Sequence, residues 1–193
     1  MAAACLALLA AALAGAAGHP EAQPIFAVEE SRSDRAVPID HVCSNEPDKE
    51  MLSDLAEFFN EVRSIDRELS GALGRGPRGR RTRDLRARRA KAVGAVAAAG
   101  ESHFGSFGAQ MCVARVLLSL GEPKAALPAA RRAVELAPQD VAALILRGMA
   151  SLRSGDRRQA ARDARAILEK SPDNKGASDL YRLATGREFK LRP

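Results

Sequence analysis

The sequence predicts an all-α protein in which antiparallel helical hairpins stack side by side, preceded by one long amphipathic helix. Apolar residues make up 46% of the 193-residue chain but aromatic residues only 4%, so alanine, leucine and valine must fill the core. Such small side chains suit closely packed helices, and alternating strand patterns are scarce. The C-terminal half also repeats a glycine and a proline at a constant offset, which is typical of stacked helical hairpins.

Residues 1–18 form an alanine-rich apolar run that predicts a signal peptide. The run has the length of a signal-peptide core and is too short to span a membrane comfortably. Small residues at Ala16 and Gly18 place a cleavage site near Gly18–His19, although no Lys or Arg precedes the run. We therefore expect a bacterial protein that is exported to the periplasm or secreted, with no transmembrane span in the mature chain. The alternative is an alanine-rich helix that stays on the protein.

Residues 19–47 contain four prolines among mixed charges, which predicts a linker without regular structure. Asp40, His41 and Cys43 bring a carboxylate, an imidazole and a thiol together within this linker. A metal site here would lack its second half, and an unstructured linker cannot hold the geometry of a nucleophile. We therefore expect no enzymatic activity, no metal and no cofactor. The sequence leaves open whether Cys43 and Cys112 form a disulfide in an oxidising compartment.

Residues 48–73 predict an amphipathic helix, because six apolar residues recur at alternating intervals of four and three positions. Acidic residues occupy the other faces of this helix. The apolar seam either packs on the rest of the domain as an internal cap or displaceable lid, or joins two copies of the chain in a coiled coil. The seam consists of Met51, Leu55, Phe58, Val62, Ile65 and Leu69.

Residues 74–91 form an Arg-rich segment that we interpret as a loop and the start of a solvated helix. Gly74, Gly76 and Gly79 match a dinucleotide-binding spacing, but no strand precedes them and Pro77 removes a backbone N–H from the loop. The alternative is an anion patch at nucleic acid or an anionic membrane, although nucleic acid is disfavoured because no aromatic residue is available for base stacking. The patch comprises Arg75, Arg78, Arg80, Arg81, Arg83, Arg86, Arg88, Arg89 and Lys91.

A repeat with a period of 34 residues governs the rest of the chain. Gly121 matches Gly155 at the turn within each unit, where positive φ ends the first helix, and Pro138 matches Pro172 at the end of each unit. Small residues match as well and allow close helix packing: Ala126 with Ala160, and Ala130 with Ala164.

The alanine and proline matches resemble the tetratricopeptide repeat (TPR) family, whose pattern places small residues at the slots of Ala126 and Ala130 and a closing proline at that of Pro138. The resemblance implies one repeat at 107–140, a second at 141–174, and a closing helix and tail at 175–193. Residues 84–106 resemble a partial upstream repeat, within which apolar residues from Leu85 to Ala99 predict a helix that Gly100 ends. The aromatic slots of the family are absent here.

The resemblance also implies a function, because the first helices of such repeats line a concave face that holds an extended or helical peptide. The sequence therefore predicts a non-catalytic protein–protein interaction module, an adaptor or scaffold, with a protein or peptide partner. Its partner-binding groove is expected to be mostly apolar and to comprise Met111, Arg115, Leu118, Ala142, Ile145, Met149, Leu152, Asp179 and Leu183.

Overall fold

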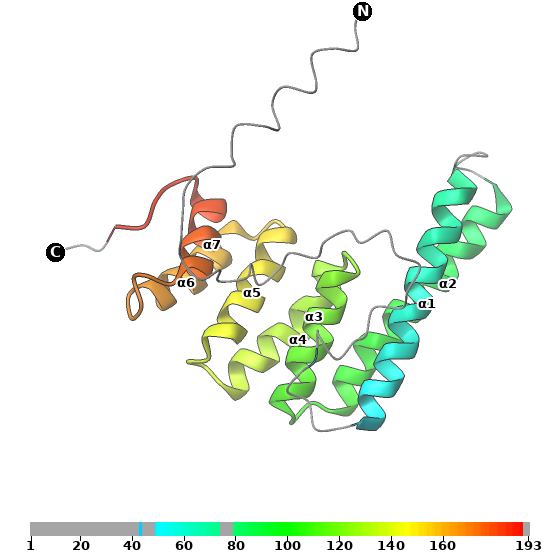
Figure 1. Ribbon diagram of the computed structural model, residues 1–193, viewed down its shortest axis with the longest axis horizontal. Coiled ribbons are helices and arrows are strands. Elements are labelled where there is room, and N and C mark those ends of the chain that lie inside the picture. Colours follow the sequence, from blue (N-terminus) through cyan, green and yellow to red (C-terminus); the bar gives the residue numbers. More distant parts are fainter. Residues whose placement is uncertain (1–42, 44–48, 74–78, 191–193) are drawn as a thin grey trace, which may run out of the picture. The chain divides into compact units, whose positions relative to one another are not determined.

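The fold was obtained as a computed structural model that describes residues 43, 49–73 and 79–190. The expected signal peptide, most of the linker, and Arg75 and Arg78 of the expected anion patch lie outside these residues. Within the described part every regular element is a helix (Figure 1). The all-α prediction is therefore confirmed. The seven helices are α1 Lys49–Leu73, α2 Arg80–Ser102, α3 Phe107–Ser119, α4 Pro123–Leu136, α5 Val141–Arg153, α6 Arg157–Leu168 and α7 Lys175–Thr185.

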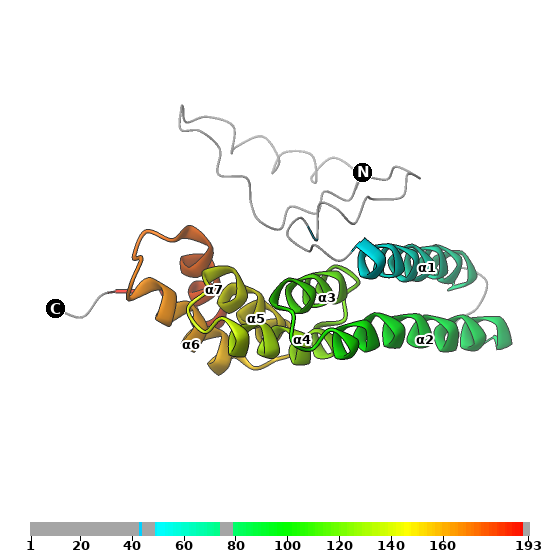
Figure 2. The ribbon, with the colours of Figure 1, turned by 90° about the horizontal axis from the view of Figure 1, so that it is seen from below.

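The helices pair in chain order into three hairpins, α1–α2, α3–α4 and α5–α6, and α7 closes the stack. Each hairpin packs on the next mainly through its second helix, which contacts the first helix that follows it: α2 contacts α3, α4 contacts α5 and α6 contacts α7. Successive first helices also contact each other, α1 with α3, α3 with α5 and α5 with α7. Figure 2 shows this layering at one end of the stack, where α1 and α3 lie on one side and α2 and α4 on the other. The expected repeats therefore appear as successive hairpins.

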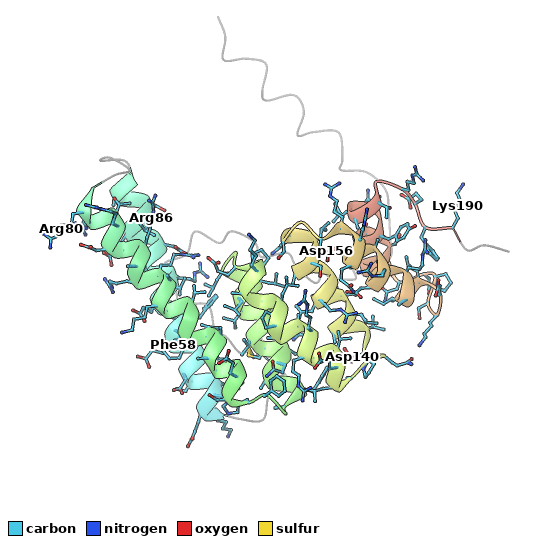
Figure 3. The ribbon with its side chains drawn as sticks, turned by 180° about the vertical axis from the view of Figure 1, so that it is seen from behind. Phe58, Arg80, Arg86, Asp140, Asp156 and Lys190 are labelled. Atoms are coloured by element: carbon cyan, nitrogen blue, oxygen red, sulfur yellow. A yellow bond between two sulfur atoms is a disulfide. The ribbon has the colours of Figure 1, made fainter. Side chains whose placement is uncertain are left out.

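The turns of the two central hairpins have the backbone geometry that the repeat predicts. Gly121 has φ of 76° and Gly155 has φ of 95°, and in each turn the next residue donates its N–H to a carbonyl of the first helix's last turn. The first helices of the units that come next are capped by side chains: Asp140 accepts from Ala143 N and opens α5 (Figure 3). Asn174 caps α7 in the same way.

Helix α1 stands beside α3 as the first helix of an additional hairpin, and α2 is its second helix. The segment expected as a partial repeat at 84–106 is thus one half of a complete hairpin. Gly100 does not end α2, because the helix runs on to Ser102. Gly100 is buried instead, where a Cβ would lie 3.2 Å from Val113 Cγ1, so its role is close packing against α3.

The hairpin α1–α2 is about twice as long as the next one, with helices of 25 and 23 residues against 13 and 14. Its first part joins the main core through Met51, Leu55 and Val62. Its outer part has a separate apolar cluster made of Ile65, Leu69 and residues of α1 and α2 only. The outer part is therefore a two-helix arm held by its own contacts.

A disulfide between Cys43 and Cys112 joins the segment before α1 to the first turns of α3, with the two Cα atoms 4.9 Å apart. Cys43 is buried in the main core together with Met51 and Leu55 of α1. The bond closes a loop of 69 residues that includes all of α1 and α2. It therefore fastens the first hairpin to the second.

We predict that the Cys43→Ala/Cys112→Ala variant is less stable by about 4 kcal/mol, because a loop of this length gains much conformational entropy when the cross-link is lost. Thermal unfolding followed by circular dichroism should show a Tm lower by about 10 °C. A reductant should lower the Tm of the natural chain by a similar amount and leave that of the variant unchanged. An unchanged Tm in the variant would contradict a stabilising role.

A buried ion pair links the two helices of the third hairpin. Arg147 donates from Nε and a terminal nitrogen to both carboxylate oxygens of Asp163, at 3.0 and 2.6 Å, and Gln159 donates to the same carboxylate. Asp163 is only 2% exposed. The second hairpin has Val113 and Ala129 at the positions one period earlier. At these equivalent positions one repeat therefore has an ion pair and the other has two apolar side chains.

We predict that Asp163→Ala lowers the free energy of unfolding by about 3 kcal/mol, because it leaves the Arg147 guanidinium without its carboxylate. The double variant Arg147→Val/Asp163→Ala reproduces the residues of the second hairpin and should cost less than the single change. Urea unfolding of both variants checks this. Equal losses in the single and double variants would show that the pair contributes only through packing.

Candidate functional site

The first helices α3, α5 and α7 present matching positions on one face of the stack, which we call the inner face. Ala142, Met149 and Arg153 share one side of α5, since they are seven and four residues apart, while Leu144 and Ser151 of the opposite side are buried. One period away in either direction, Arg115 of α3 and Leu183 of α7 match Met149. A row of side chains thus runs across the three helices.

The structure divides the nine residues expected in the groove into three groups. Ala142 and Leu183 are exposed, and Leu183 is 56% exposed despite its size. Arg115, Met149, Leu152 and Asp179 are partly buried.

The other three expected groove residues, Met111, Leu118 and Ile145, are at most 7% exposed and belong to the main core. They point toward neighbouring helices: the Cδ1 atom of Ile145, for example, lies 3.3 Å from where a Cβ on Gly176 of α7 would be. The accessible inner face is therefore narrower than the expected groove.

The inner face also carries two cations, Arg115 and Arg153. Arg115 is half-buried, and the loss of solvent lowers the pKa of its guanidinium, while the charge of Asp140 opposes that change. Arg153 is exposed and donates to the carbonyl of Leu118 at 3.2 Å. Sequence reasoning missed Arg153, although its position four residues after Met149, on the same side of the helix, would have identified it. On α7, the carboxylate of Asp179 accepts from Arg182 at 2.8 Å.

The Arg-rich segment serves in part to join α2 to α1. Arg81 lies 3.7 Å from Glu68, and Arg88 lies 4.0 Å from Glu61. Both pairs are largely exposed, so each contributes little to stability.

Arg89 of α2 links its own helix to α1 and to the turn between α3 and α4. It donates from Nε to Asp66 of α1 at 2.6 Å, to the carbonyl of Leu120 at 2.9 Å, and to Glu122 in the α3–α4 turn. The hydrogen bond to Asp66 is the main cause that raises the pKa of this guanidinium. Arg89 therefore belongs to the frame that joins α1, α2 and the second hairpin.

The remaining cations of the described patch are exposed on α2, namely Arg80, Arg83, Arg86 and Lys91. Arg80 begins α2 at the outer end of the arm, and Figure 3 shows its side chain projecting away from the helices.

The described residues offer no group of three or more His, Cys, Asp or Glu side chains that could hold a metal ion. Cys43 is engaged in the disulfide, and Asp40 and His41 lie outside the described residues. Among the described helices none is long and apolar enough to cross a membrane.

Comparison with known proteins identifies the repeat. Residues 107–150 match the family model of the tetratricopeptide repeat, which covers α3, α4 and most of α5. No curated protein and no solved structure matches the chain. The match supports a tetratricopeptide repeat over residues 107–150, in agreement with the residue pattern there. Proteins of this family are generally non-catalytic interaction modules.

Proposed function

Because residues 107–150 form a tetratricopeptide repeat, we propose that the chain is an exported adaptor that binds a peptide or helix of another protein on the inner face. The observation that carries the proposal is the row across α3, α5 and α7. It offers Met149 of α5 and the exposed Leu183 of α7 as apolar groups, with Ala142 on the same side of α5, and it carries the guanidinium groups of Arg115 and Arg153.

The chemistry of this row suits an apolar segment of the partner. Burial of Leu183 and Ala142 under a ligand removes apolar surface from water, which is favourable by about 25 cal/mol per Å². Met149 has a flexible thioether side chain that adapts to different apolar groups. The two arginines would donate hydrogen bonds to carboxylate or carbonyl oxygens at the edges of the bound segment. We therefore favour a short amphipathic ligand.

The alternative, anion binding through the Arg-rich segment, has weaker support. Arg81, Arg88 and Arg89 are engaged with acidic residues of the same fold. The described α2 also has no aromatic side chain that could stack on a base.

Self-association through the seam of α1 is also disfavoured. Met51, Leu55, Val62 and Ile65 are at most 2% exposed, so α2 and the core already cover them. Phe58 and Leu69 are partly buried in the same packing.

We predict that a photocrosslinking amino acid at position 142 captures a discrete partner protein in the native host. A probe at Ala98, an exposed alanine on α2, is the matched control and should not give this adduct. Leu183→Glu should lower the yield of the position-142 adduct by about tenfold or more, because a carboxylate at the apolar row must be desolvated on binding. Identical adducts at positions 142 and 98 would contradict the inner-face assignment.

Export is supported by the Cys43–Cys112 disulfide, since such bonds persist mainly in oxidising compartments. We predict that the protein purified from its native host begins near His19 and contains no free thiol. N-terminal sequencing and a thiol assay under denaturing conditions check both points. A chain that retains residues 1–18 and has free thiols at Cys43 and Cys112 would be inconsistent with export.

A further inference from the structure

We propose that the chain has a second docking site, on the side of the stack opposite the inner face, for a peptide that combines aliphatic and acidic residues. The site is a groove of about 630 Å³ that we call the outer groove. Its floor is the N-terminal half of α5, and its walls are the end of α4 and the C-terminal half of α6. The residues of the inner face do not line it, so the two sites are independent.

The floor of the outer groove is apolar and partly open to solvent. Val141 is 38% exposed, which makes it one of the few large apolar side chains on the described surface. It is the first residue of α5, directly after the capping Asp140, so the helix start fixes its position. Leu144 and Ile167 are buried beside it. An aliphatic side chain of a ligand would pack on Val141, next to the buried Leu144 and Ile167, and would remove the exposed part of Val141 from water.

The walls of the outer groove carry two cations that donate hydrogen bonds to neutral amide groups. Arg162 donates to the amide oxygen of Gln159 at 2.6 and 3.2 Å, and Lys170 donates to the amide oxygen of Gln139. Arg147 also lines the groove, but Asp163 neutralises it. Glu169 is the acidic residue on the same rim, and the two cations Arg162 and Lys170 exceed it by one charge. The groove therefore has excess positive charge beside an apolar floor.

An apolar floor beside cationic walls favours one class of ligand. A ligand carboxylate would replace a neutral amide oxygen as the acceptor for Arg162 or Lys170, and charge-assisted hydrogen bonds are about twice as strong as neutral ones. A purely apolar ligand would desolvate both cations without compensation. A nucleic acid would need a continuous basic track with aromatic platforms, and the groove lining has none. An aliphatic residue flanked by Asp or Glu satisfies both the floor and the walls.

The test uses fluorescence anisotropy with the disulfide-bonded chain and a labelled eight-residue peptide of alternating leucine and glutamate. We expect saturable binding of this probe and no binding of the matching leucine–lysine peptide. Arg162→Glu/Lys170→Glu should weaken binding by at least about tenfold. Val141→Asp should weaken it similarly, and an aspartate is compatible with the first turn of a helix, so the fold is kept. Circular dichroism verifies the helicity of each variant.

Arg157→Glu/Lys175→Glu is the matched control, because both cations are exposed and lie outside the groove. It should retain the affinity of the natural chain within about twofold, and so should Leu183→Glu on the inner face. Equal losses in the groove variant and this control would show general electrostatic attraction and overturn the proposal. Absence of binding by the acidic probe, or a loss caused by Leu183→Glu alone, would overturn it as well. None of these results depends on whether the inner face binds its own partner.

Discussion

Close helix packing through small side chains is the constraint on which the whole structure depends. Ala114, Ala126, Ala130, Ala160 and Ala164 are all fully buried, each where one helix crosses another. With so few aromatic residues, the chain cannot fill wide gaps, and dispersion contacts fall steeply when atoms separate. The helices must therefore pack with short distances between their axes. At Gly148 the approach is closer still, since a Cβ there would lie 2.5 Å from Cδ2 of Leu180.

Hydrogen bonds, ion pairs and one disulfide add to the packing of this small-residue core at the junction between the first two hairpins. Arg89 connects α1 and α2 to the turn after α3, and the amide of Gln110 donates to the carbonyl of Gly100, which joins α3 to the end of α2. The Cys43–Cys112 disulfide lies at the same junction. The long first hairpin shares only part of its length with the core, so these ties hold it in the stack.

The two candidate binding faces differ because α5 has different neighbours on its two sides. Its inner side continues the row of first helices, where Met149 and Ala142 remain accessible. Its other side forms the floor of the outer groove between α4 and α6, and Val141, Arg162 and Lys170 all line that groove. Two such faces would let one chain hold two different segments at once, as a scaffold does.

The sequence by itself determined the helical class, the period of 34 residues, and the turns at Gly121 and Gly155, because these depend on local backbone preferences and on apolar spacing. It also indicated which side of each first helix is apolar. Only the tertiary structure decided that Met111 and Ile145 face neighbouring helices while Leu183 faces solvent, since spacing gives a side of a helix but not what covers it. The partner of Cys112, the role of Arg89 and the outer groove were decided in the same way, because each joins residues that are distant in the chain.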